Sequence, residues 1–453
     1  MAERLESLWE DLRSHLLFIP GVLVVLGIIL AVVLVEVDRR LVEPETIRGV
    51  PWLFGGGAPG ARGVLSTIAS AMAQLAGITF SVTIVALALR SQQFGPRLLR
   101  HFTRDKGNQI VLGTFLATFV YALLVLRSVR GLDDAEFVPL LAVTGAIILA
   151  LMSLAAFIFF IDKVVDSIQA TSIIASVAEE AHAAIETLFP EQVGEEEDEP
   201  EAEDYPPFVS AAEVLAPATG YIQDVDAEKL LELTRETGII LRMEAPIGGF
   251  VVKGTPLAMA MPSVQLSGEL KRELQRAYRI GRHRSITKDP EFGFRQIVDV
   301  AVKALSPSMN DPTTAVTCLE FLGALLIDLS TRSVPSRLRH DEEGHLRVIA
   351  LGSSFPGMVR LAFDQIQEHG HEDVAVTVAL LETLIRVGRA VRAPVRRQAL
   401  EAQVWKVARG ANGSIADPTD RERINRLLQL AMERVGGGER GAAHHLLPLQ
   451  KAG

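Results

Sequence analysis

Residues 16–35 read LLFIPGVLVVLGIILAVVLV and contain no charged side chain. About 20 apolar residues in a helix are enough to cross the hydrocarbon core of a bilayer, so this stretch predicts a transmembrane helix. Three similar stretches follow at 64–89, 110–126 and 137–161, and no later stretch is comparable. The pattern indicates a transmembrane domain of four helices at 1–165, followed by a large soluble part.

Length and composition limit the remaining possibilities. The 453 residues allow more than one domain, because single cores seldom grow beyond about 250–300 residues. The formal net charge of −10 argues against nucleic acid as a partner, because phosphate binding needs a basic surface. The chain has one cysteine, Cys318, which excludes an intramolecular disulfide and fits a reducing compartment.

The first apolar stretch is interpreted as an uncleaved transmembrane helix. The 15 residues before it form no basic leader, because they carry more acidic than basic side chains. The loop between the second and third stretches is strongly basic, with Arg90, Arg97, Arg100, Arg104 and Lys106. The positive-inside rule places this loop, and with it both termini, in the cytoplasm of a bacterial inner membrane. The basic residues of the first loop (36–62) oppose this orientation.

The soluble part divides by composition and periodicity. Helical spacing of apolar residues continues through 162–188, which predicts a helix leaving the membrane without a break. A run of Glu and Asp with no apolar cluster follows and predicts a disordered linker. The expected parts are a helical extension at 166–190, an acidic linker at 191–207, a small β module at 208–262, a cytoplasmic helical domain at 263–435 and a flexible tail at 436–453.

The β module is predicted from short apolar runs between Gly and Pro turns. These runs lie at 220–222, 239–241, 250–252 and 257–259, with a short helix at 227–236. Their spacing resembles lipoyl/biotinyl-like barrel-sandwich modules, but Ala260 stands where a carrier lysine is needed, so no cofactor is expected. Further helices are expected at 270–280, 294–305, 312–329, 358–367, 374–391, 395–408 and 417–435, and 346–351 is a strand or the start of a short insertion.

The second apolar stretch carries the most suggestive polar pattern. Its polar and small residues recur three and four apart and therefore share one helical face: Thr67, Ser70, Gln74, Gly77 and Ser81. Lipid cannot satisfy the hydrogen bonds of that face. Two interpretations remain open: the face lines a pore or substrate path, or it packs closely against another helix. No charged residue lies well inside a span, so a proton relay is not indicated.

A second candidate site follows the β module. Asp311 before Pro312 predicts a helix N-terminus, where free amide groups can hold an anion. The anion- or ligand-binding candidates are Arg284, Arg295, Lys303, Asn310 and Asp311. Basic residues at 271–284 suggest anionic lipid or a small anionic ligand as partners. The alternatives are a tight turn for the Asp311 region, and for the basic run a pairing with the acidic linker or an ordinary solvated helix face.

No metal site or catalytic residue is predicted. His340, Asp341, Glu342, Glu343 and His345 form one polar patch, and residues 369–373 form another. Both patches read as surface loops, since neither matches a helix-borne metalloprotease pattern. An enzyme is therefore the least favoured class.

Three motifs carry a family resemblance: Ser91-Gln92-Gln93-Phe94-Gly95-Pro96-Arg97, Phe292-Gly293-Phe294-Arg295-Gln296 and Ser306-Pro307-Ser308-Met309-Asn310-Asp311-Pro312. Over nearly its whole length the chain resembles the bacterial predicted membrane protein family known as domain of unknown function 2254. The resemblance supports the architecture and implies no activity.

The resulting expectation is an integral membrane α-helical protein with a cytoplasmic α+β region, a small barrel-sandwich-like module and a helical bundle. The leading functional hypothesis is a homo-oligomeric channel-like or transport protein gated by its cytoplasmic domain. The alternative is a non-conducting membrane-anchored scaffold or sensor that binds lipid, ligand or protein.

Overall fold

The computed structural model describes residues 18–41, 54–94, 106–130, 137–189, 208, 211–263 and 266–436. They belong to two compact units, Met1–Ser172 and Ile173–Gly453. The acidic linker at 191–207, most of the basic loop at 95–105 and the tail from residue 437 lie outside the described residues.

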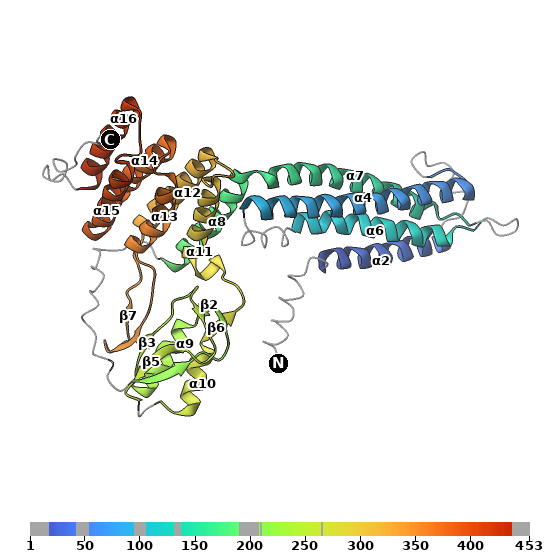
Figure 1. The fold of residues 1–453 in the computed structure, drawn as a ribbon. Coiled ribbons are helices and arrows are strands. Elements are labelled where there is room, and N and C mark those ends of the chain that lie inside the picture. The colour runs from blue at the N-terminus through green and yellow to red at the C-terminus, as the bar shows by residue number, and fades with distance from the viewer. Residues whose placement is uncertain are drawn as a thin grey trace. The chain divides into compact units, whose positions relative to one another are not determined.

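In its described residues, the first unit contains four long helices that run side by side (Figure 1). They are α2 (Phe18–Leu41), α4 (Ala58–Phe94), α6 (Lys106–Ser128) and α7 (Leu140–Ile168). Large side chains such as Tyr121, Phe115 and Phe160 fill the space between them. Many apolar side chains of α2 and α7 point outward and are exposed. Such a surface suits hydrocarbon and would be unfavourable in water.

Glycines bring α2 and α6 into close contact. A Cβ at Gly27 would lie 2.9 Å from the backbone oxygen of Ala117, and a Cβ at Gly113 would lie 2.9 Å from the Pro20 Cα. Small residues on both helices therefore let the two backbones approach, as is common between membrane helices.

Hydrogen bonds between helices satisfy polar groups inside the first unit. The buried Asp38 carboxylate accepts hydrogen bonds from the Leu141 and Ala142 amides at 3.0 and 2.9 Å, so α2 caps the start of α7. The Tyr121 hydroxyl donates to the Ala142 carbonyl at 2.8 Å. These contacts fix the register between the helices.

Among the residues that the structure describes, five helices are long and apolar enough to cross a membrane, where four were expected. The fifth is α12 (Pro312–Ser330), which the sequence analysis assigned to the soluble domain. It packs against α11 (Pro290–Ala304), α13 (Phe355–Gly370) and α14 (Val374–Ala390). A helix buried among other helices needs the same apolar composition as one buried in lipid, so length and composition do not distinguish the two environments.

The expectation of an unbroken helix through 162–188 is wrong. Helix α7 ends at Ile168, Gln169 has extended backbone angles (φ −70°, ψ 131°), and α8 begins at Ala170 and ends at Leu188. Neither proline nor glycine stands at the break, so helical periodicity gave no signal of it. The break interrupts the continuous helix that the sequence predicts between the fourth apolar stretch and the soluble part.

The second unit contains two small sheets that share one core. The strands are β1 (Ala212–Leu215), β2 (Gly220–Val225), β3 (Ile240–Met243), β4 (Phe250–Val251), β5 (Pro256–Met261), β6 (Tyr278–Gly281), β7 (Leu338–His340) and β8 (Leu346–Ile349). One sheet has the order β1-β5-β3-β8-β7, and the other has the order β4-β2-β6. Every pairing is antiparallel except that of β3 with β8. Helices α9 (Ala227–Thr237) and α10 (Gly268–Arg276) join the same core.

The four expected strands and the short helix are confirmed within β2 to β5 and α9. The expected helix at 270–280 is too long, because α10 ends at Arg276 and residues 278–281 pair with β2 as β6. Strand β8 confirms the strand interpretation of 346–351. Strands β6, β7 and β8 of these sheets come from beyond residue 262. The sheets therefore extend past the contiguous segment 208–262 that the sequence predicts for the β module.

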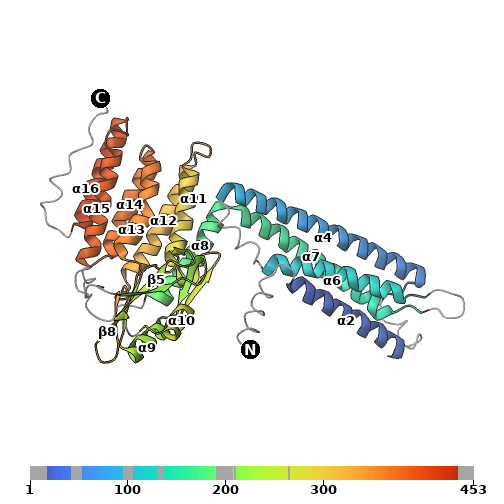
Figure 2. The same cartoon turned by 60° about the horizontal axis from the view of Figure 1, so that its bottom comes forward.

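Helices α11 to α14, α15 (Pro394–Ala411) and α16 (Pro418–Val435) stand side by side in the rest of the second unit (Figure 2). Their starts are encoded locally. Asp289, Asp311 and Asp417 each cap a helix whose first residue is proline, and Ser354 and Asp373 cap α13 and α14. A capping side chain followed by proline favours a helix start at that position.

Candidate functional site

The polar face of α4 points away from the core of the first unit. All five predicted residues, Thr67, Ser70, Gln74, Gly77 and Ser81, are exposed. The opposite side of the same helix supplies the buried Leu65, Ala69, Met72 and Ala76. The five residues therefore lie together on one outer face, and they do not line the interior of the four-helix unit.

Two features suit this outer face to close contact with another helix. Nothing lies within 4 Å of a Cβ placed at Gly63 or Gly77, so both glycines leave open space. The Thr67 hydroxyl is satisfied within its own helix by the Gly63 carbonyl at 2.8 Å. Positions 63, 67, 70, 74, 77 and 81 alternate steps of four and three, which is the seven-residue repeat of a left-handed helix pair.

Arg284, the first anion-binding candidate, is already paired. Its guanidinium donates to both carboxylate oxygens of Asp289 at 2.7 and 3.0 Å. Asp289 is buried and also accepts a hydrogen bond from the Phe292 amide at the start of α11. Burial raises the pKa of Asp289, and Arg284 opposes that shift. Gly248 (φ +80°) packs so closely here that a Cβ would overlap the Asp289 carboxylate.

The structure does not gather the five anion-binding candidates. Arg295 donates to the Gln365 side chain at 3.2 Å, halfway along α11. Lys303 is in the last turn of α11, about 21 Å along the helix from Asp289 at 1.5 Å per residue. Asn310 and Asp311 follow Lys303, so they lie at the opposite end of α11 from Arg284.

The Ser-Pro-Ser-Met-Asn-Asp-Pro stretch at 306–312 forms the turn between α11 and α12. The Asn310 amide donates to the Ser306 carbonyl and the Asp311 amide to the Ala304 carbonyl, both at 2.9 Å. Asn310 has φ 45°, a left-handed conformation that asparagine tolerates better than most residues. Asp311 then accepts hydrogen bonds from the Thr314 amide at 3.1 Å and the Thr314 hydroxyl at 2.6 Å. These contacts favour the tight-turn alternative for this stretch.

We expect the stabilisation of the α12 N-terminus by the Asp311 carboxylate to depend on pH. Hydrogen bonds from the Thr314 hydroxyl and amide hold the pKa of Asp311 below its ordinary value. The folded-state pKa is therefore below the unfolded one, so this stabilisation is complete above pH about 4 and is lost as pH falls through the folded-state value. The melting-temperature advantage of wild type over Asp311→Asn should shrink as the pH drops from about 6 to 3. A constant advantage would contradict this assignment, since asparagine keeps the capping oxygen without the charge.

The β7–β8 hairpin brings together three ligand-type side chains, Asp341, Glu343 and His345, whose atoms lie within 4.8 Å of one another. The Asp341 carboxylate is already engaged. It accepts from the Arg347 Nε at 2.7 Å and from the Glu343 and His345 amides at 3.1 and 2.9 Å. These bonds lower the pKa of Asp341, with that from Arg347 the strongest cause. A cation would have to displace the arginine, so the arrangement explains a hairpin and supports no metal assignment.

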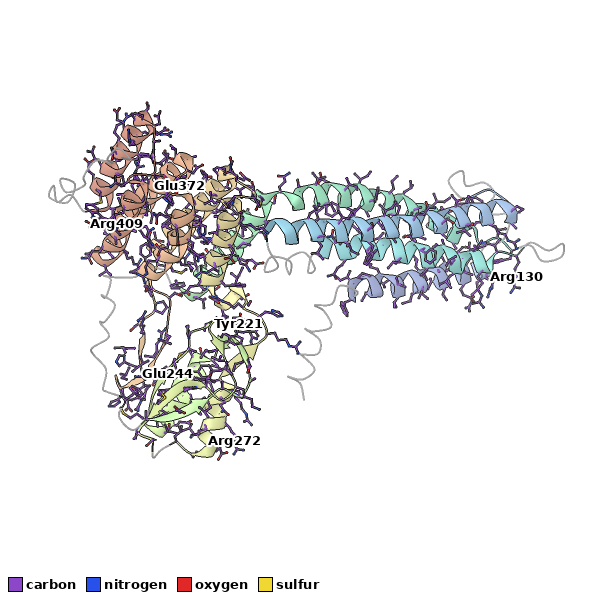
Figure 3. The ribbon with its side chains drawn as sticks, viewed as in Figure 1. Arg130, Tyr221, Glu244, Arg272, Glu372 and Arg409 are labelled. Carbon is purple, nitrogen blue, oxygen red and sulfur yellow. The ribbon has the colours of Figure 1, made fainter. Side chains whose placement is uncertain are left out.

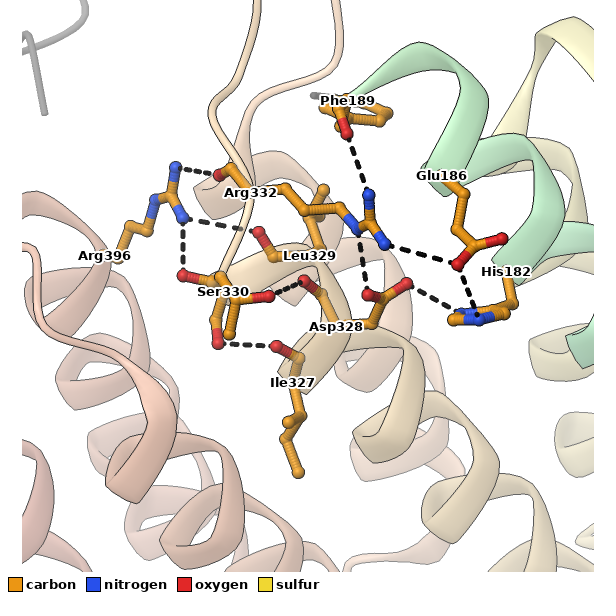
Figure 4. Close-up of polar contacts among 10 residues, drawn as sticks. His182, Glu186, Phe189, Ile327, Asp328, Leu329, Ser330, Arg332 and Arg396 are labelled. Atoms are coloured by element: carbon orange, nitrogen blue, oxygen red, sulfur yellow. Dashed lines mark hydrogen bonds and ion pairs between the residues drawn. The ribbon is translucent and has the colours of Figure 1, made fainter. Parts of the chain in front are cut away.

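Sequence reasoning missed a polar network between α8 and α12 (Figure 4). His182 Nδ1 lies 2.8 Å from Asp328 Oδ2, and Arg332 Nε donates to Asp328 Oδ1 at 2.9 Å. Arg332 also lies 3.5 Å from Glu186 and donates to the Phe189 carbonyl at 3.2 Å. His182/Glu186 and Asp328/Arg332 are both spaced four apart, which places each pair on one helix face. That spacing was the available signal, but it does not reveal that the two pairs face each other.

Arg396 extends the same network from α15. Its buried guanidinium donates to the carbonyls of Leu329, Ser330 and Arg332 at 3.4, 3.0 and 2.9 Å. The Leu329 and Ser330 carbonyls lie in the last turn of α12, where partners within the helix run out, and the Arg332 carbonyl lies just beyond it. The Leu329 carbonyl also accepts a hydrogen bond from the Arg332 amide at 3.2 Å. A positive charge there also complements the helix dipole. Arg396 therefore joins α15 to the end of α12.

Comparison with known proteins agrees with this architecture. A family model described as "Predicted membrane protein (DUF2254)" matches residues 13–386. The chain belongs to this family. The uncharacterized protein Rv1290c of Mycobacterium tuberculosis is 34% identical to this DUF2254 chain over 374 residues, which cover 81% of the chain and 71% of the relative. The uncharacterized protein Mb1321c of Mycobacterium bovis matches with the same identity and coverage. No solved structure matches the chain significantly.

The family match confirms the resemblance inferred from the three sequence motifs. It covers residues in both units of the DUF2254 chain and ends within α14. The second motif lies in the first half of α11, and the third forms the turn before α12. The first motif reaches the end of α4 at Phe94, and its last three residues lie outside the described residues. The family description supports a membrane protein and names no activity.

Proposed function

We propose that this protein is a multi-pass inner-membrane protein whose α4 outer faces meet in a homo-oligomer and surround a channel-like path. The proposed spans are α2, α4, α6 and α7, with α12 in the cytoplasmic unit and both termini in the cytoplasm. The observation that carries the proposal is the exposure of the α4 polar face opposite the buried side of the helix.

The physical argument rests on Gln74. Within the described residues its amide makes no hydrogen bond, and hydrocarbon would leave both its donors and its acceptor unsatisfied. A second copy of α4 or water would satisfy them. Gly63 and Gly77 leave room for a neighbouring backbone, and the seven-residue repeat keeps the faces in contact along the helix.

A path between subunits fits the packing better than one through a single subunit. The described part of the four-helix unit is filled by Tyr121, Phe115, Phe160 and Leu65, each essentially unexposed. The Tyr121 hydroxyl is bonded to a backbone carbonyl. The hydroxyl, amide and glycine groups that could contact a permeant polar species therefore lie on the outer face of α4.

A non-conducting scaffold is the second candidate. It is favoured by the helix break at Gln169, which removes the stiff connection that a gate would use. In that case the same α4 faces pack directly against one another, with the small residues in contact and no water between them.

We expect Gln74→Leu to alter ion flux and to weaken assembly. The measurement is ion flux in liposomes that contain the purified chain, with the subunit number determined by native mass spectrometry. Loss of one interhelical hydrogen bond per contact costs about 0.6–2 kcal/mol, or roughly 3- to 30-fold in association. Gln74→Asn keeps an amide and should keep the oligomer. Phe80→Leu changes an exposed apolar side chain of the same helix that is not one of the polar-face residues, and it should behave as wild type.

Three outcomes separate the candidates. An oligomer whose flux changes with Gln74→Leu supports the path. An oligomer without flux in several salts supports the scaffold. A wild-type monomer in mild detergent and in native nanodiscs would contradict both.

A further inference from the structure

The outer face of the β4-β2-β6 sheet carries an aromatic pair, of which Phe250 is exposed and Tyr221 is half-buried. Tyr221 of β2 is directly opposite Phe250 of β4, and their rings meet edge to face with centroids 5.1 Å apart. Figure 3 labels Tyr221 on this sheet. Phe250 is 58% exposed, and Val252, two residues further along the same side, is 48% exposed. The other side of the sheet is buried through Ile222 and Val251.

Basic side chains border these apolar groups. Arg279 belongs to β6 two residues before Gly281, which pairs with Tyr221, so Arg279 shares the outer face. Its side chain is 66% exposed and lies 3.8 Å from Asp224. Arg282 and Lys253 are exposed at the ends of β6 and β4. We call Tyr221, Phe250, Val252, Lys253, Arg279 and Arg282 the aromatic–basic face.

The composition of the aromatic–basic face indicates which kind of partner it binds. An aromatic ring and a valine beside arginine and lysine match the boundary between lipid headgroups and acyl chains, where aromatic side chains are enriched and basic ones meet anionic headgroups. The same chain carries apolar helices long enough to span a bilayer, so a membrane is always within its reach. Each ingredient alone is common on protein surfaces, but here Tyr221, Phe250 and Arg279 share one side of one small sheet. Val252, Lys253 and Arg282 are exposed just beyond the strand ends that border it.

We propose that the aromatic–basic face binds the surface of a bilayer that contains anionic lipid. Phe250 and Val252 enter the headgroup region, and Arg279, Arg282 and Lys253 bind phosphate groups. The inference goes beyond the role proposed for α4 and does not depend on it, since a monomer without flux would have the same face.

Two other occupants are weaker matches. The acidic segment at 191–207 offers charge to the arginines, but its run of Glu and Asp offers little to cover Phe250 and Val252. A second copy of the face would place arginine against arginine, which is unfavourable.

The test is amide hydrogen exchange of the full chain in nanodiscs of phosphatidylcholine, with and without phosphatidylglycerol. We expect slower exchange at residues 250–253 and 279–282 when anionic lipid is present. Each basic residue near a membrane surface strengthens binding roughly fivefold, so Arg279→Gln with Arg282→Gln should weaken the bound state roughly 25-fold and abolish the protection. Phe250→Ser with Val252→Ser should abolish it as well.

The matched control is Arg235→Gln with Arg272→Gln, which removes two exposed charges from α9 and α10 and should leave the protection unchanged. We expect all of these variants to fold, because every substituted side chain is exposed or borders solvent. Equal melting temperatures would show that they do.

Three results would overturn the proposal. One is equal exchange at the face in uncharged and anionic discs. Another is protection that rises with the number of chains per disc, which would assign the face to a second copy. The third is a face that is protected in uncharged discs and released by Glu195→Gln, Glu196→Gln and Glu197→Gln together, which would assign it to the acidic segment.

Discussion

Replacement of Arg396 by methionine is expected to lower the stability of the second unit by about 3 kcal/mol. Methionine keeps the apolar stem of the side chain but removes every donor. The carbonyls of Ser330 and Arg332 would then lose a hydrogen-bond donor in a buried position, and the Leu329 carbonyl would keep only the Arg332 amide. The stacking of the guanidinium over the Phe355 ring, at 5.4 Å, would be lost too.

Equilibrium unfolding of the purified full chain in guanidinium chloride measures this loss of stability. Trp405 lies in α15, the helix of Arg396, so its fluorescence reports on the affected region. Arg409→Met makes the same chemical change at an exposed position of α15 (Figure 3) and should cost less than about 0.5 kcal/mol. Equal midpoints for the two variants would show that Arg396 does not support the end of α12.

Replacement of Gly27 by valine is expected to cost the first unit about 2–3 kcal/mol, because two backbones meet at this point. The new Cβ would lie 2.9 Å from the Ala117 carbonyl oxygen and 3.3 Å from the Ala117 Cβ. A backbone oxygen cannot rotate away as a side chain does, so α2 and α6 would have to separate along their length.

Gly21→Val is the matched control. It lies in the same helix and has nothing within 4 Å of the added Cβ. The melting temperature of the full chain in mild detergent should fall for Gly27→Val and stay near the wild-type value for Gly21→Val. Similar losses for both would indicate that β-branching within α2, and not contact with α6, sets the cost.

The α4 face shows how far sequence reasoning reached at the candidate site. The three- and four-residue spacing of Thr67, Ser70, Gln74, Gly77 and Ser81 predicts one shared face, because helical periodicity is a local property. The periodicity does not say whether that face points into the bundle or out of it. The structure places Leu65 and Met72 inward, and the polar face is therefore outward.

For the anion-binding candidates, the sequence indicates the helix start correctly but not which residues lie near it. Asp311 before Pro312 correctly indicates a helix start, and the structure uses it as one. The expectation that Arg284 and Arg295 lie nearby had no local basis, since α11 separates them from the turn. Arg284 instead pairs with Asp289, five residues further along the chain, which spacing alone did not reveal.

Sequence alone determined the features that depend on neighbouring residues. These are the apolar lengths of α2, α4, α6 and α7, the capped start of α12, and the Gly-bounded strands β2 to β5. Each follows from periodicity, capping or turn chemistry within a few residues. The family resemblance also rested on such short motifs.

Only the tertiary structure decided the features that depend on partners distant in sequence. Residues 278–281 form a strand because β2 offers a free edge, and α12 is surrounded by other helices. Arg396 contacts the end of α12 because folding brings it to three backbone carbonyls that lie 64–67 residues earlier in the chain. Hydrogen bonds and burial depend on which surfaces meet, and that information lies in the packing of the whole chain and in no single segment.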